Sequence, residues 1–211
     1  DEGGPDFDFG AGTILGKTAE GKDIVLAGSK SGAAFGIDPD TGKKLWETRL
    51  GHGGVVGGVN FGIAAAGSRL FVPVSDAPDG KTYPIPGGQG IYGLNLETGA
   101  KLWGEPAGNA TCQGRKDCNP GFGGAISATP ELVFAGADDG HLRVFSAADG
   151  KVLWDHDTFR DYTTVNGVAA RGGSIGGGAA PIAWKGLLIA SSGYGYANKM
   201  PGNVLLVFTV K

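Results

Sequence analysis

One phrase occurs three times in this chain and ends each time in a tryptophan, at Trp46, Trp103 and Trp154. Its shared core is Thr/Asp-Gly-x-x-Leu-Trp, and the tryptophans are 57 and 51 residues apart. A repeat of this length is one supersecondary unit, which must stack on its neighbours to bury its apolar faces. The glycine of each phrase supplies the positive φ that a tight turn needs.

A strand-like apolar run precedes each phrase, at 32–37, 90–94 and 141–145. Glycine accounts for 42 of the 211 residues and separates these runs. Many short strands with Gly-rich turns are typical of all-β proteins, and no stretch has the periodicity of a long helix. The repeats therefore predict an all-β fold, a β-propeller with one blade per repeat.

Four repeat units are expected, at 1–50, 51–107, 108–158 and 159–211. The strands predicted in them are 23–27, 33–37, 69–74, 90–94, 131–135, 141–145, 186–191 and 203–210. Segment 75–89 interrupts the second unit and is rich in Pro, Gly and Asp, so it is expected to line or cover a site. The last unit ends on a strand, as a C-terminal end would, and the first resembles the middle of a longer protein. We therefore expect about half of a wider propeller ring.

Charge and cysteine content narrow the classes of partner. The net charge is −3 and no basic stripe is present, which argues against a nucleic-acid partner. No run of apolar residues is long enough to span a membrane. Cys112 and Cys118 suit a small disulfide loop, although two free thiols or half of a metal site are alternatives. The disulfide interpretation favours a periplasmic or secreted protein.

Three stretches offer chemistry. Asp6 and Asp8 alternate in an extended segment and so share one face, where they could serve as a general base or bind a hard cation; a solvated loop is the alternative. Lys30 lies in a turn between two expected strands, where it could polarise a carbonyl or simply be exposed. Asn166 and Arg171 lie in a Gly-rich stretch suited to an anion or a quinone, or to a long loop between blades.

The ordered set of motifs resembles the eight-bladed quinoprotein dehydrogenases, which bind pyrroloquinoline quinone (PQQ). The resemblance implies that the four expected blades are half of an eight-bladed ring. The repeated phrase is similar to their tryptophan-docking repeat. Further similarity is seen in Pro-Asp-Phe-Asp-Phe-Gly-Ala-Gly at 5–12, in 123–145, in Thr-Val-Asn-Gly-Val-Ala-Ala-Arg-Gly-Gly-Ser at 164–174, and in Ser-Ser-Gly-Tyr-Gly at 191–195. Together these stretches look like the C-terminal half of a polyvinyl alcohol dehydrogenase-like member, and the resemblance covers essentially the whole chain.

The resemblance implies roles for single residues. Asp8 matches the family's catalytic aspartate, which also approaches Ca²⁺, and Asp6 is the second match. Lys30 matches the cation that contacts the quinone carbonyl, and Asn166 and Arg171 become candidates for binding PQQ. The chain departs from the alcohol dehydrogenase branch because it has no adjacent cysteines and no Cys-x-x-Cys-His haem motif.

The resemblance thus implies part of a PQQ- and Ca²⁺-dependent alcohol dehydrogenase, incomplete by itself. Its expected partners are an alcohol substrate, an N-terminal propeller half or a second copy of the chain, and a cytochrome c as electron acceptor. The alternative is a non-enzymatic propeller that acts as a scaffold or binding module. Asp8 and Lys30 discriminate between the two, because a scaffold has no need for a carboxylate and an ammonium that converge on the propeller axis.

Overall fold

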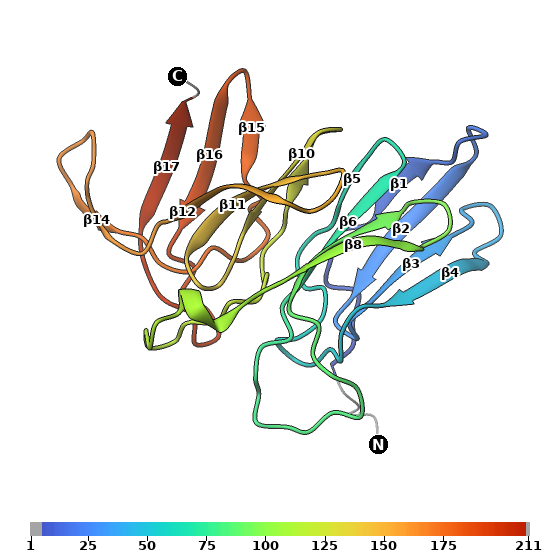
Figure 1. The fold of residues 1–211 in the computed structure, drawn as a ribbon, viewed down its shortest axis with the longest axis horizontal. Helices are drawn as coiled ribbons and strands as arrows, with labels where there is room; N and C mark the ends of the chain where they lie inside the picture. Colours follow the sequence, from blue (N-terminus) through green and yellow to red (C-terminus); the bar gives the residue numbers. More distant parts are fainter. Residues whose placement is uncertain (1–5, 210–211) are drawn as a thin grey trace.

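The computed structural model describes residues 6–209, and nearly all of their regular structure is β-strand (Figure 1). Three antiparallel sheets have four strands each, and each sheet follows the chain order from its first strand to its last. Their strands are β1 (Ile14–Lys17), β2 (Asp23–Ser29), β3 (Ala33–Ile37) and β4 (Lys44–Arg49); β5 (Ala64–Ala66), β6 (Arg69–Val74), β7 (Gly90–Asn95) and β8 (Lys101–Pro106); and β9 (Ser127–Ala128), β10 (Leu132–Gly136), β11 (His141–Ser146) and β12 (Val152–Asp157).

A fourth sheet has three strands in the described part of the chain, β15 (Ile182–Trp184), β16 (Leu187–Ser192) and β17 (Val204–Thr209). A separate hairpin of β13 (Asp161–Thr163) and β14 (Ala169–Arg171) precedes it, and a single 3₁₀ turn, η1, covers Asn109–Thr111. None of the helical structure within residues 6–209 has the length and apolar character that crossing a bilayer requires.

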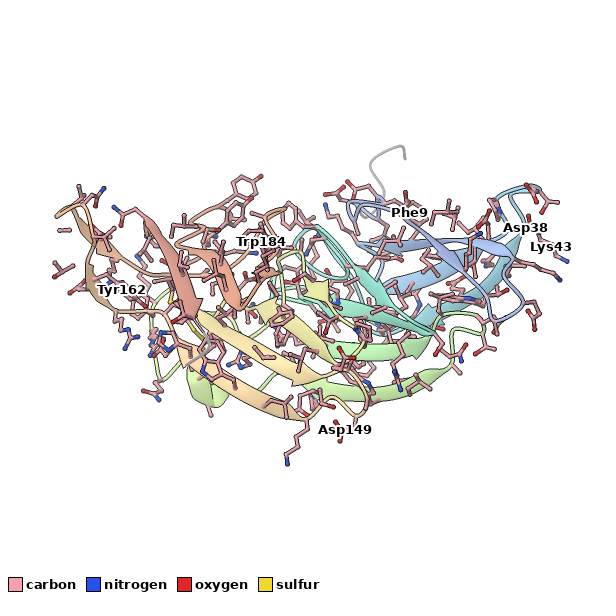
Figure 2. All side chains as sticks on the ribbon, turned by 90° about the horizontal axis from the view of Figure 1, so that it is seen from above. Phe9, Asp38, Lys43, Asp149, Tyr162 and Trp184 are labelled. Atoms are coloured by element: carbon pink, nitrogen blue, oxygen red, sulfur yellow. A yellow bond between two sulfur atoms is a disulfide. The ribbon has the colours of Figure 1, made fainter. Side chains whose placement is uncertain are left out.

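The four sheets are the blades of a propeller, numbered here I to IV along the chain. The first strands of successive blades lie side by side, β1 against β5 and β5 against β9, so they form the inner edge. Isolated parallel bridges between Gly12 and Gly62 and between Gly124 and Gly177 reinforce this inner edge. Seen from above, the blades form an open arc, with Asp149 at its convex rim and Trp184 nearer its hollow side (Figure 2). The prediction of an all-β propeller is confirmed.

The boundaries of the four repeat units stay a prediction, although each blade falls inside a different predicted unit. The eight-bladed ring also stays a prediction.

The tryptophan of each phrase joins one blade to the next. Trp46 lies on the outer strand β4, and its Nε1 donates a hydrogen bond to the carbonyl of Leu96 in blade II at 3.1 Å. Its ring fits between Gly36 of its own blade and Gly99 of the next phrase, where a Cβ at Gly99 would come within 2.5 Å of the ring. Trp103 repeats this arrangement, because its Nε1 donates to the Ala147 carbonyl at 3.1 Å.

The third tryptophan is placed differently. Trp154 packs edge-on against Phe208 of blade IV, with ring centroids 5.1 Å apart, instead of lying over a glycine turn. Blade IV has no Thr-Gly-x-x-Leu-Trp phrase to supply such a turn. A cavity of about 690 Å³ remains between blades III and IV, and Trp154, Trp184 and Phe208 are among its walls.

The hydrophobic core is divided among the joints between blades. Ile24 and Leu26 of blade I pack in one cluster with Leu70 and Val72 of blade II. A second cluster joins blades II and III and includes Phe71, Ile91, Phe122, Val133 and Phe145. The joint between blades III and IV buries a smaller cluster of Leu142, Ile175 and Ala190. The side chains alternate along each strand, so each sheet packs one face against each neighbour.

Candidate functional site

The segment Asp6–Phe9 lies against the turn between β2 and β3, which carries Lys30. The backbone N–H of Lys30 donates to the Asp8 carbonyl at 2.9 Å, and the Ser29 hydroxyl donates to the Phe7 carbonyl at 3.1 Å. These bonds fix the extended segment beside the turn, with the aspartates on alternate residues. Both carboxylates therefore reach the Lys30 ammonium.

The two aspartates differ in how they meet Lys30. Asp6 makes the closer ion pair, with a hydrogen bond from the Lys30 Nζ, whereas an Asp8 oxygen lies 3.8 Å from that atom. The Asp8 side chain is 60% exposed and the Lys30 side chain 13% exposed. Asp6 is thus the main counterion of Lys30, and Asp8 has more of its acceptor capacity free for a ligand.

A cavity of about 310 Å³ opens beside this group. Asp6, Asp8 and Lys30 line one part of it, and blade IV contributes Tyr196 and Lys199. Asn60 and Phe61, which lead into β5, complete a mixed polar and apolar wall. This size lies at the lower end of small-molecule sites, which are roughly 300–1,000 Å³.

Asp76 ties together the loops around this cavity. Its buried carboxylate accepts four backbone N–H bonds, from His52 (2.8 Å), Gly53 (3.1 Å), Gly58 (2.7 Å) and Gly88 (2.7 Å). Segments 51–58 and 75–89 are thereby held to each other. Ala77, Pro78 and Asp79 of the second segment line an adjoining cavity, in keeping with its expected place near a site.

The structure does not bring the other two candidates to this group. Asn166 lies in the hairpin formed by β13 and β14, where its side chain accepts a hydrogen bond from the Thr164 hydroxyl. Arg171 is half exposed, pairs with Asp161 at 3.4 Å and covers the Phe159 ring at 4.7 Å. Among residues 6–209, the walls of the cavity beside Lys30 include neither residue. Their role in cofactor binding stays a prediction.

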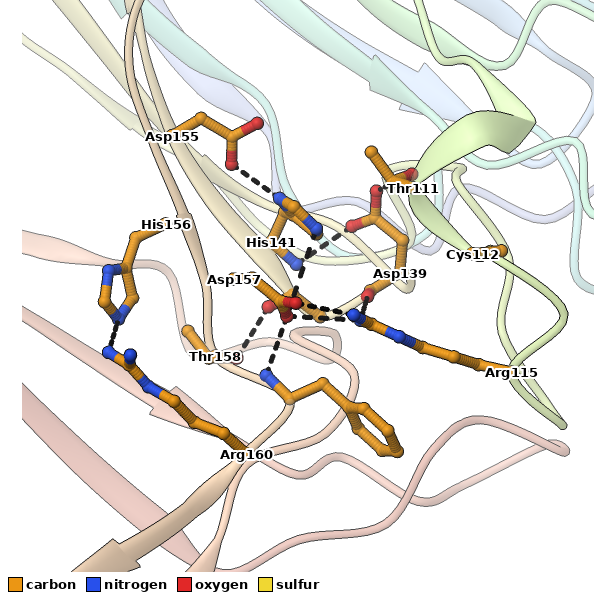
Figure 3. A network of polar contacts seen from close by, with 12 residues as sticks. Thr111, Cys112, Arg115, Asp139, His141, Asp155, His156, Asp157, Thr158 and Arg160 are labelled. Carbon is orange, nitrogen blue, oxygen red and sulfur yellow. Dashed lines mark hydrogen bonds and ion pairs between the residues drawn. The ribbon is translucent and has the colours of Figure 1, made fainter.

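Cys112 and Cys118 are joined by a disulfide (S–S 2.10 Å), in a loop that carries Arg115. Arg115 forms a two-pronged pair with Asp157 at 2.5 and 3.1 Å (Figure 3). Burial opposes ionisation of Asp157, but its hydrogen bonds from Arg115 and from the Phe159 N–H outweigh burial and lower its pKa. The contact fastens the disulfide loop to blade III.

A second ion pair lies beside the same cavity. Lys199, in the loop between β16 and β17, contacts Asp138 in the turn between β10 and β11, with Nζ and Oδ2 2.9 Å apart. Neither residue is among the site residues predicted from the sequence. Asp138 could have been found by aligning the repeats, because Gly-Ala-Asp-Asp-Gly at 136–140 matches Gly-Ser-Lys-Ser-Gly at 28–32. Lys199 stands alone in a loop and gives no such signal.

The residues present fit a quinone better than they fit a calcium ion. Lys30 places an ammonium group on the cavity wall, which suits an anionic quinone. Ca²⁺ takes about six to eight oxygen ligands. Among residues 6–209 no group of three or more His, Cys, Asp or Glu side chains could hold a metal ion. The Asp8 carboxylate would be at most one ligand among several from elsewhere.

Fold and repeats together define a β-propeller built from PQQ-type repeats. The chain belongs to the PQQ_2 family, whose model is described as "Outer membrane protein assembly factor BamB" and matches residues 6–203. It is 38% identical over 218 residues to a polyvinylalcohol dehydrogenase from Pseudomonas sp, and 37% identical over 221 residues to one from Sphingopyxis sp. (strain 113P3). Both alignments cover 98% of this chain and 33% of the relative, so the chain spans about a third of their length.

Solved structures share the fold at lower identity. The quinohemoprotein alcohol dehydrogenase from Comamonas testosteroni aligns with a TM-score of 0.60 at 16% identity, over 97% of this chain and 38% of that chain. BamB from Moraxella catarrhalis aligns with a TM-score of 0.57 at 18% identity, over 92% and 45%. Likeness at this level supports the propeller fold and nothing beyond it.

Proposed function

We propose that this chain is part of a quinoprotein dehydrogenase that oxidises the hydroxyl groups of alcohols with PQQ. The convergence of Asp8 and Lys30 on one cavity carries the proposal. The identity of 37–38% to two polyvinylalcohol dehydrogenases supports the same reaction class and favours a substrate with many hydroxyls. A scaffold propeller has no need for this pair.

Asp8 is the residue that removes the hydroxyl proton. Its carboxylate is exposed to the cavity and is the less tightly paired of the two aspartates. A general base must lie within hydrogen-bond reach of the proton that it takes, and the open position of Asp8 permits this approach. Asp6 holds the Lys30 ammonium in place.

Lys30 binds the oxygen that gains negative charge. Its ammonium is fixed by two carboxylates and largely shielded from water, and a charge aimed at a fixed point is most effective in such a setting. PQQ, when bound, supplies the acceptor for the two electrons and the hydrogen that leave the alcohol carbon. Ca²⁺ would need oxygen ligands beyond those that residues 6–209 bring to this cavity.

Three further features of the protein belong to this proposal. The disulfide supports a periplasmic or secreted location, because such bonds persist in oxidising compartments. The open arc of blades supports completion of the ring by further blades, from an N-terminal half or a second copy. A cytochrome c is the proposed electron acceptor, by the family resemblance alone.

The test is calorimetric titration of the chain with PQQ in the presence of Ca²⁺, together with dye-linked oxidation of 2-pentanol. Lys30→Ala is expected to weaken PQQ binding at least tenfold, because it removes a charged hydrogen-bond donor. Asp8→Asn is expected to retain binding and lose oxidation. Lys22→Ala, an exposed lysine in the turn between β1 and β2, is the control. Absence of PQQ binding would favour the scaffold function instead.

A further inference from the structure

The Asp138–Lys199 pair is unusually enclosed for two charged residues. The Asp138 side chain is fully buried and the Lys199 side chain is 11% exposed. Gly123 and Gly176 lie on either side of the pair, and a Cβ at Gly123 would overlap both the carboxylate and the ammonium. Absence of side chains at these two positions makes the space for the pair.

The backbone around the pair is also held firmly. The Ser174 hydroxyl donates to the Asp138 carbonyl at 2.6 Å and accepts from the Met200 N–H at 2.9 Å. This one side chain links the turn of blade III to the loop that carries Lys199. Two contacts therefore fix the position of the Lys199 ammonium. One is its ion pair with Asp138, and the other is the hydrogen bond from the backbone of the next residue, Met200, to Ser174.

The pair occupies the place in blade III that Lys30 occupies in blade I. The Lys30 N–H donates to the Asp8 carbonyl, and the Asp138 N–H donates to the Gly121 carbonyl, at 2.9 Å in both cases. Each turn is thus hydrogen-bonded to the segment that precedes the first strand of its own blade. Equivalent turns of two blades each present an ion pair, with the charges reversed.

Lys199 lies on the wall shared by two cavities. The cavity beside Lys30 and a second one of about 530 Å³ are both lined by Val55, Val56, Ala197 and Lys199. The second cavity extends between segment 75–89 and the disulfide loop, where Pro78 and Asn119 line it. Its walls contain both apolar and polar side chains, which suits a carbon chain that carries hydroxyls.

We propose that Lys199, positioned by Asp138, binds a second hydroxyl of a substrate that carries several hydroxyls, while Asp8 and Lys30 engage the hydroxyl to be oxidised. The inference rests on the proposed function and names the substrate class of that site. An ammonium has three N–H donors, and among the described residues Asp138 is the one partner of Lys199 within ion-pair distance. A hydroxyl oxygen in the shared cavity would accept one of the others.

A ligand in the cavity cannot contact the Asp138 carboxylate, because both of its oxygens are buried. Neither carboxylate oxygen is open to the cavity, so a ligand meets Lys199 and Asp138 acts behind it. Burial raises the pKa of Asp138 to about 6, against the opposing effect of Lys199. At neutral pH the carboxylate is therefore ionised and keeps the ammonium in place.

The experiment compares 2,4-pentanediol with 2-pentanol, which has the same carbon skeleton and one hydroxyl fewer. In the protein loaded with PQQ and Ca²⁺, Lys199→Met is expected to lower kcat/KM for the diol about tenfold and to leave 2-pentanol within twofold. Saturation-transfer NMR of the diol with the cofactor-free protein is expected to show the same loss. Lys185→Met, which removes an exposed lysine over the Trp184 ring, is the control.

Two variants guard against misfolding. Lys199→Met leaves a buried carboxylate unpaired, so the double variant Asp138→Asn/Lys199→Met removes both charges and is expected to keep the fold by circular dichroism. It should show the same selective loss for the diol. Equal losses for both alcohols, or a loss of PQQ affinity, would overturn the inference, the latter by assigning Lys199 to the quinone carboxylates. If the unaltered protein oxidises neither alcohol, the proposed function fails, and the NMR comparison still decides whether the second hydroxyl is bound.

Discussion

At the scale of single residues, Asp76 shows how one carboxylate organises a glycine-rich region. Its φ of 37° lies in the left-handed region, which Asp and Asn adopt more readily than most residues. Four backbone N–H groups that no strand satisfies converge on its two oxygens. Loop segments of this composition would otherwise leave buried donors unpaired.

Asp76→Asn is expected to destabilise the protein by about 2–4 kcal/mol. The amide keeps one acceptor and turns an NH₂ group toward two N–H donors, each of which costs about 1–3 kcal/mol when left unpaired. Asn also tolerates the backbone conformation, so the change isolates the lost acceptor. Urea unfolding measures the effect. Asp40→Asn, on an exposed loop, should change stability by less than about 0.5 kcal/mol; equal effects at the two sites would contradict the role of Asp76.

Asp138 gives the protein a distinct dependence on pH. Its pKa is about 6 in the folded protein and 3.8 in an unperturbed chain, so between these values the folded state binds more protons than the unfolded state. Stability contributed by this residue is therefore present below pH 4 and is lost as the pH rises to about 6, by about 3 kcal/mol.

The difference in unfolding free energy between the unaltered protein and Asp138→Asn should reveal this loss. When the two proteins are compared at pH 4 and at pH 7, the unaltered protein should lose unfolding free energy relative to Asp138→Asn as the pH rises. Asp155 and Asp157 have lowered pKa values, so their contribution is lost only as the pH falls below about 4. Parallel curves for the two proteins would show that Asp138 titrates as it does in the unfolded chain.

The sequence was informative about this site only where it carried a pattern. Asp6, Asp8 and Lys30 could be proposed because two alternating acids and a turn lysine occur in motifs similar to a known family. Lys199 could not, because its place depends on how the loop between β16 and β17 folds over a turn 61 residues away. Asn166 and Arg171 share a motif with the family but lie in a hairpin outside the cavity wall.

At the scale of elements, the strands that were predicted are those with apolar residues on both faces. The middle strands β2, β6, β10 and β11 are almost wholly buried, and each overlaps a predicted range. The outer strands β4, β8 and β12 were not predicted as strands. In β4 and β8 the tryptophan is the one buried residue, so no alternation of apolar and polar residues marks these strands in the sequence.

The contribution of the tryptophan joint to stability can be tested at the glycine of the repeated phrase. Gly42 and Gly99 occupy the same place in successive phrases and have φ values of 70° and 71°. Nothing lies within 4 Å of a Cβ built at Gly42, whereas Trp46 fills that space at Gly99. Substitution by alanine therefore introduces the same backbone strain at both positions and a steric overlap at one of them.

Gly42→Ala is expected to cost about 1–2 kcal/mol, from the left-handed backbone alone. Gly99→Ala should cost about 1–3 kcal/mol more, because Trp46 must move from its place in the joint. Thermal unfolding followed by tryptophan fluorescence measures both effects. Equal losses of stability would mean that the ring over Gly99 contributes little to the joint.

At the scale of the whole molecule, the end of the arc at blade IV exposes apolar side chains. Strand β17 is the last of its sheet in the described chain, and Leu205 and Val207 on it are exposed. An exposed apolar edge strand is a template for pairing with another chain. The number of blades in a complete ring was expected from resemblance, and the four blades described here do not determine it.

We expect the chain to associate with itself through this edge as its concentration rises. Val207→Lys places a charge on the edge and should shift the association constant at least tenfold toward the monomer. Sedimentation equilibrium measures the shift. Val168→Lys, at a similarly exposed apolar position in the β13–β14 hairpin, should leave the association unchanged; an equal shift in both variants would point to a general effect of charge.

The tryptophan joints also have a direction. In the two joints that carry the full phrase, the indole of the earlier blade packs against a glycine of the later blade. Its N–H donates to a backbone carbonyl of that later blade. Head-to-tail contacts of this kind can be repeated from one blade to the next, and the rotation at each joint decides where the ring closes. Duplication or deletion of a whole repeat leaves both flanking joints chemically unchanged. Joints of this kind would allow a propeller gene to gain or lose whole blades, while the residues at the hollow side diverge independently.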